Sequence, residues 1–190
     1  MNKRNAQTII RAYPSSFPRF ARYGPEDRYF SAPGAGICIS VFAIARRGKK
    51  LLAGLPNLDH SKWEREWFPN VRAYSAADRK AYSETLQVPC TYLREGEHPE
   101  DALDRVLRAQ VCATDYEERA LDVGSYTHPS TWYPKNRHWD LVFTYEVDAT
   151  LPARARPWWS ELGWFDASKL RAADFGWNGD LMRDLGIVKK

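Results

Sequence analysis

Apolar residues follow the chain in two patterns: short runs typical of strands, and a three- and four-residue spacing typical of a helix. Residues 36–45 are rich in β-branched and aromatic side chains, and residues 50–53 return after a basic turn. These two runs predict a hairpin. Three further runs predict strands over residues 91–93, 119–126 and 138–147.

The clearest helical pattern lies within residues 88–112. Its apolar residues recur on one face: Leu103, Val106, Leu107 and Val111. Pro99 stands in the first turn, where a helix tolerates proline. Acidic residues favoured by the helix dipole gather beside it: Glu97, Glu100 and Asp101. A second helix is predicted over residues 75–85, with Ser75 as its cap.

Residues 88–112 join a strand, an acidic turn and this helix, and the segment resembles the box of the Nudix hydrolases. That box reads Gly, five residues, Glu, seven residues, then Arg-Glu-aliphatic-x-Glu-Glu-x-Gly. With Glu97 on the first Glu, Arg105 falls on the Arg and Leu107 on the aliphatic position. Pro89 falls on the proline that usually precedes the box glycines.

The segment departs from the box at the positions that carry its chemistry. Val106, Ala109 and Gln110 stand where the family has glutamates. In the family those carboxylates share a helical face and hold Mg²⁺ or Mn²⁺, which activates water. Valine and alanine offer no ligand, and the glutamine only a neutral oxygen, so no catalytic residue, metal or cofactor is expected. The box glycines are replaced by Cys90, Thr91 and Cys112.

The resemblance implies an α/β fold, a Nudix-like mixed β-sheet sandwiched between helices, over residues 36–190. Residues 161–166, 167–170 and 178–185 resemble the strand, short helix and last helix that end such a domain. Residues 1–35 then form an N-terminal arm, and residues 55–85 an insertion before the box. Trp63 and Trp67 in the insertion either pack in the core or form a partner or ligand surface.

Composition and charge bear on the number of domains and on the role of the N-terminal arm. The chain has 190 residues, 44% hydrophobic and 14% aromatic, which suits one globular domain with extensions. The net charge of +4 belongs to residues 1–30, because the other 160 residues carry 22 basic and 22 acidic side chains. Basic arms commonly bind nucleic acid or an acidic protein partner. An extension packed by its own aromatic residues is the alternative.

Several classes of site are disfavoured by the sequence. Cys38, Cys90 and Cys112 lack metal-ligand spacing, as do the four histidines, so zinc is not expected. Nucleophile-elbow, phosphate-loop and dinucleotide-binding motifs are missing. No apolar run predicts a membrane span, so no membrane partner is expected. An odd number of cysteines suggests reduced thiols, which favours the cytoplasm, with an organelle matrix as the alternative.

An active enzyme would need relocated metal ligands. The candidates are Glu97, Asp101 and Asp104, spaced along one helical face, with Glu118 or its neighbour Glu117 from beyond the helix. Such a stripe is more often the solvated face of an amphipathic helix. Glu97 alone supplies too few oxygens for Mg²⁺ and is expected in the first helical turn. The partner of Arg105 is Glu97, Asp101 or Asp104.

The polar loop over residues 127–137 and the strand after it interleave aromatic residues with cations: Trp132, Tyr133, Lys135, Arg137 and Trp139. Such residues can stack bases and hold phosphates, and we predict a ligand-binding role for them. An aromatic plug over a small core is the alternative. Residues 154–159 form a second loop of the same kind.

These observations favour a Nudix-superfamily protein with a degenerate box that binds a nucleotide or RNA without hydrolysing it. A divergent hydrolase with relocated carboxylates, using Mg²⁺ or Mn²⁺ on a nucleoside diphosphate-linked substrate, is the competing class. An architectural subunit that uses its arm and insertion for protein contacts is the third.

Overall fold

The computed structural model describes residues 37–58, 76–94, 96–113, 115–129, 137–149 and 157–189. Within them a mixed sheet of six strands has the order β4–β5–β1–β2–β6, and β3 pairs with β1 off this path. The strands are β1 (Ile37–Arg47), β2 (Lys50–Pro56), β3 (Cys90–Tyr92), β4 (Tyr116–Pro129), β5 (Arg137–Ala149) and β6 (Trp159–Asp166).

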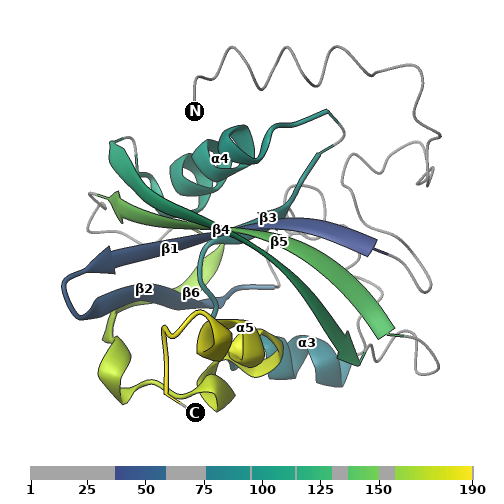
Figure 1. The fold of residues 1–190 in the computed structure, drawn as a ribbon. Coiled ribbons are helices and arrows are strands. Elements are labelled where there is room, and N and C mark those ends of the chain that lie inside the picture. The colour runs from purple at the N-terminus through teal and green to yellow at the C-terminus, as the bar shows by residue number, and fades with distance from the viewer. Residues whose placement is uncertain are drawn as a thin grey trace, which may run out of the picture.

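Helices cover both faces of this sheet. They are α3 (Ala76–Ser83), α4 (Pro99–Val111) and α5 (Gly179–Asp184), with the 3-10 helices η2 (Ala167–Lys169) and η3 (Ala172–Asn178). Figure 1 shows α4 on one side of the sheet and α3 and α5 on the other. The predicted fold class, a mixed sheet between helices, is confirmed. None of the described helices is long and apolar enough to cross a membrane.

Strand β1 is the centre of the sheet because it pairs with three others. It runs parallel to β5 and antiparallel to β2 and β3. Its residues are buried on both faces: Val41 and Ala43 join the core under α4, and Phe42 and Ile44 join the core on the α5 side. This double burial explains why β1 is the most uniformly apolar run of the sequence.

The predicted strands agree with the observed ones to within one residue where β1 begins and where β3 lies, and β4 and β5 are longer at both ends than predicted. The extra residues of β4 and β5 are mostly polar, and they are strand because β4 and β5 pair antiparallel along almost their whole length. The helix predicted over residues 75–85 is α3. The arm over residues 1–35 and residues 59–75 of the insertion, with Trp63 and Trp67, lie outside the described residues.

Candidate functional site

The candidate site is the unit of β3, turn and α4 that resembles the Nudix box. Strand β3 is held by β1, with Cys90 opposite Phe42 and Tyr92 opposite Ser40. The helix begins at Pro99, and the cap residue His98 accepts a hydrogen bond from the Glu100 amide at 3.3 Å through Nδ1. Strand, turn and helix therefore follow one another as in the box.

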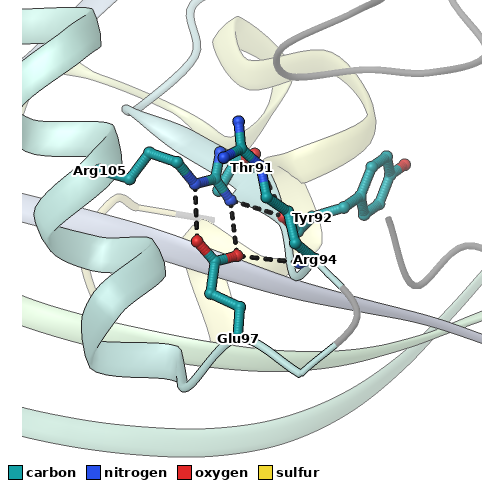
Figure 2. Close-up of polar contacts among 5 residues, drawn as sticks. All are labelled: Thr91, Tyr92, Arg94, Glu97 and Arg105. Atoms are coloured by element: carbon teal, nitrogen blue, oxygen red, sulfur yellow. Dashed lines mark hydrogen bonds and ion pairs between the residues drawn. The ribbon is translucent and has the colours of Figure 1, made fainter. Parts of the chain in front are cut away.

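An ion pair between Arg105 and Glu97 ties the helix to the turn (Figure 2). Arg105 Nε donates to Glu97 Oε1 at 2.7 Å, and Nη2 donates to Oε2 at 2.8 Å. The Arg94 amide donates to the same Oε2 at 2.8 Å, while Arg105 also reaches the Tyr92 carbonyl at 3.1 Å. Both side chains are mostly buried, at 14% and 11% exposure. Bidentate geometry and burial make this a strong, specific pair.

The structure thus selects Glu97 among the three predicted partners of Arg105. The prediction that Glu97 lies in the first turn of the helix is wrong. α4 begins at Pro99, so Glu97 precedes the cap residue His98. Its carboxylate is turned toward Arg105 because a guanidinium and a backbone amide together satisfy both oxygens.

The α4 face that would carry the box carboxylates is packed into the core. Val106 is fully buried and Gln110 is 1% exposed. Gln110 Nε2 donates to the Cys90 carbonyl at 2.8 Å, which ties the end of α4 to β3. Its Oε1 has no hydrogen-bond donor among the described residues. A glutamate here would place a charge in the core and would face the Cys90 carbonyl without a proton to donate.

Two tryptophans cover the end of the same helix. Trp158 Nε1 donates to the Ala109 carbonyl at 3.1 Å, and Trp159 Nε1 donates to the Gln110 carbonyl at 3.0 Å. Carbonyls in the last turn of a helix have no partner within the helix, so the indoles satisfy groups that otherwise need water. Both rings are buried in the core under α4. The sequence indicated only an aromatic loop here; the tandem tryptophan before a strand is the signal for this role.

The helix ends at a left-handed residue in the position of the last box glycine. Cys112 adopts the left-handed conformation with φ 55°, which favours glycine. The Ala113 amide then donates to the Leu107 carbonyl at 2.9 Å and closes the helix. A residue other than glycine therefore carries the left-handed conformation that closes this helix.

The described residues of the β3, turn and α4 unit do not fit a divalent metal. Mg²⁺ needs several oxygens in near-octahedral geometry, whereas Val106 and Ala109 supply none. Both oxygens of Glu97 are engaged, and Asp104 accepts bonds from Arg108 at 2.7 Å and from the Tyr116 hydroxyl at 3.3 Å. Within the ranges that the structure describes, no three His, Cys, Asp or Glu side chains lie close enough to hold a metal ion.

The relocated carboxylates do not converge. Asp101 is exposed on α4, and Glu118 is exposed on β4. Burial raises the pKa of Tyr116 to about 12, and the neighbouring Asp104 carboxylate contributes to that rise. Glu97 is mostly buried against Arg105, Asp101 is exposed, and Asp104 accepts from Arg108 and Tyr116. The three carboxylates therefore do not form one solvated stripe.

The predicted aromatic and basic loop joins the far ends of β4 and β5. Trp132, Tyr133 and Lys135 lie outside the described residues, and Arg137 and Trp139 are described only by their backbone. Arg137 opens β5 opposite Pro129 of β4. The ligand-binding role of this loop stays a prediction.

A buried acid, which the sequence pattern did not reveal, follows this loop in β5. Asp140 is 8% exposed, and Ser40 Oγ donates to its Oδ1 at 2.9 Å. Burial raises the pKa of Asp140 to about 7, and the Ser40 hydrogen bond opposes that rise. Burial and the nearby Asp140 together raise the pKa of the Cys90 thiol to about 12. The signal in the sequence is an aspartate inside an otherwise apolar strand.

Comparison with solved structures identifies the fold. A bifunctional NMN adenylyltransferase/ADP ribose pyrophosphatase from Francisella tularensis is similar at TM-score 0.52 and 12% identity, over 81% of this chain and 41% of that one. A Nudix hydrolase from Nitrosomonas europaea is similar at TM-score 0.50 and 13% identity, over 78% and 73%. A UDP-X diphosphatase is similar at TM-score 0.50 and 8% identity, over 96% and 68%.

The chain therefore has a Nudix-like fold, as its resemblance to the box implied. It spans less than half the length of the Francisella protein. No family model matches the sequence, and no curated protein sequence does so either.

We expect Gln110→Glu to lower the free energy of unfolding at pH 8 by about 3 kcal/mol, because it buries a carboxylate beside the Cys90 carbonyl. The two side chains have the same shape, so packing is unchanged. At pH 5 a protonated Glu regains a donor, and the loss should shrink. Denaturant unfolding of the variant and the parent at both pH values measures this loss in free energy of unfolding. Equal stability of variant and parent at pH 8 would contradict the assigned packing.

Asp140→Asn should instead stabilise the protein at high pH. The pKa of Asp140 is about 7 in the fold against an ordinary value of 3.8. The unfolded chain therefore loses the proton first, and the contribution of Asp140 to stability falls as pH rises from about 4 to about 7. The gain from Asn should be small near pH 4 and reach on the order of 2–4 kcal/mol at pH 8. Asp122→Asn, an exposed change on β4, is the control and should show no such trend.

Proposed function

We propose that this Nudix-fold protein binds a nucleotide or RNA and does not hydrolyse a diphosphate bond. The observation that carries the proposal is the burial of the Val106 and Gln110 side chains, on a helix whose last carbonyls accept from the indoles of Trp158 and Trp159. In the box that this helix resembles, the same positions carry carboxylates that need access to a metal and to substrate. Side chains buried in this way serve packing, and neither a metal nor a substrate can contact them.

The nucleotide class is supported by the fold and by the predicted loop. Two of the similar structures are named for enzymes of ADP ribose and UDP-X. Trp132 and Tyr133 offer aromatic rings that can stack a base, and Lys135 and Arg137 offer cations for phosphates. The basic arm over residues 1–35 would add phosphate or protein contacts. Recognition of this kind needs no metal.

We expect hydrolysis of ADP-ribose, NADH and nucleoside triphosphates to stay at background with Mg²⁺ or Mn²⁺. Without a bound metal, the protein would lack transition-state stabilisation worth several kcal/mol. Calorimetric titration without metal should still detect binding of a nucleotide or an RNA oligonucleotide. Turnover on the order of one per second or faster, abolished by chelation, would establish the hydrolase alternative. If neither a nucleotide nor an RNA oligonucleotide binds, the result would favour the alternative of an architectural subunit.

Replacing Trp132 or Tyr133 with Ala should weaken nucleotide or RNA binding by roughly 1–3 kcal/mol if the ring stacks on a base. Lys135→Gln should weaken binding more at low salt than at high salt, because a phosphate contact is mainly electrostatic. Affinity and melting temperature are measured on the same Trp132→Ala sample. A lower melting temperature with unchanged affinity would show that the ring packs in the core and does not contact the ligand.

A further inference from the structure

The turn between β1 and β2 carries the densest run of positive charge in the described structure. Four of its five residues are cations, Arg46, Arg47, Lys49 and Lys50, around Gly48. Gly48 has φ +59°, which allows the tight turn. Arg47, Lys49 and Lys50 are exposed at this tip, which lies at the left edge of Figure 1. Charges outside residues 1–30 balance over the chain, so this excess is local.

A fourth exposed cation, Lys169, lies near this turn although it is more than 100 residues away in the sequence. β6 pairs with β2 so that Asp166 lies opposite Lys50. The Ala167 amide donates to the Lys49 carbonyl at 3.0 Å, which places η2 against the turn. Lys169, the last residue of η2, is exposed. Hydrogen bonds from Ser168 are the main reason why the pKa of the Asp166 carboxyl is lowered, and the charges of Lys169 and Lys49 lower it further. Both lysines therefore lie near Asp166.

Asp166 is the acid that lies beside these cations, and its carboxyl is already engaged by Ser168. Asp166 accepts bonds from the Ser168 hydroxyl at 2.7 Å and from the Ser168 amide at 3.0 Å, which cap η2. In the described ranges no ion pair joins an acid to Arg47, Lys49, Lys50 or Lys169. Arg46 differs, because it lies 3.7 Å from Glu146.

An aromatic ring orients one of the cations. The Arg47 guanidinium lies over the Trp164 ring, 4.6 Å from its centroid. A stacked guanidinium is held in one plane, so its N–H edge can meet a phosphate while its free face can meet a base. An acidic peptide would use the charges and leave this platform unused. Single-stranded RNA uses both, because its phosphates alternate with unpaired bases.

We propose that Arg47, Lys49, Lys50 and Lys169 form a surface that binds the phosphates of single-stranded RNA. The proposal rests on the proposed function only in taking RNA as the ligand. It assigns the contact to residues outside both the degenerate box and the loop over residues 127–137. We call these four residues the hairpin surface.

The test is binding of a fluorescein-labelled 20-nucleotide oligouridine to the full chain, by anisotropy from 50 to 300 mM KCl. For single strands the salt slope changes by about 0.7 for each phosphate that the protein no longer neutralises. Lys49→Gln/Lys50→Gln should therefore reduce the slope by about 1.4, and Lys169→Gln by about 0.7. The matched control Arg79→Gln/Lys80→Gln removes the same charge from exposed sites on α3 and should leave the slope unchanged.

Equal slopes for the hairpin double variant and the parent would overturn the proposal, and so would equal reductions in the hairpin and α3 variants. In both cases RNA binding by the parent would still support the proposed function. Failure of the parent to bind oligouridine would also overturn it, while nucleotide titration tests the proposed function separately. Polyglutamate that competes as well as oligouridine, with the same weakening in the hairpin variant, would reassign the surface to an acidic protein.

Discussion

The bidentate pair between Arg105 and Glu97 holds the β3, turn and α4 unit in one arrangement. Glu97 also accepts from the Arg94 amide, and Arg105 also donates to the Tyr92 carbonyl. Removing either partner would leave a mostly buried charge uncompensated, which costs more than the pair itself contributes. Because this pair sets the direction in which α4 leaves the turn, it also determines which helix residues enter the core.

The consequence is a helix whose backbone follows the Nudix box while its side chains have different roles. Cys112, at the position of the last box glycine, takes a left-handed conformation, and Leu107 is buried. Gln110 bonds to β3, and the indoles of Trp158 and Trp159 satisfy the last carbonyls. Each of these bonds gives a buried polar group a partner, so the helix face that is catalytic in the box contributes here to stability.

Because Val106 and Gln110 are buried, the proposed recognition of phosphate would rely on cations elsewhere in the chain. Charge balances beyond residue 30, yet four cations in five residues make a local excess at the β1–β2 turn. Asp166 lies opposite Lys50, and it is engaged by Ser168. Exposed cations with an aromatic support favour a polyanion, just as the oxygen-poor face of α4 disfavours a metal.

The sequence by itself determined β1 to β5 and α4 closely, since the spacing of apolar residues reports which face of a strand or helix is buried. The elements from β6 onward were expected from the resemblance to the Nudix family, and η3 was not predicted. It also showed which box carboxylates are missing and narrowed the partner of Arg105 to three acids on or beside the same helix. Only the tertiary structure decided the contacts between distant segments. Trp158 and Trp159 meet α4 across 49 residues, Ser40 meets Asp140 across 100, and η2 meets Lys49. These contacts follow from strand order, which leaves no periodic trace in the chain.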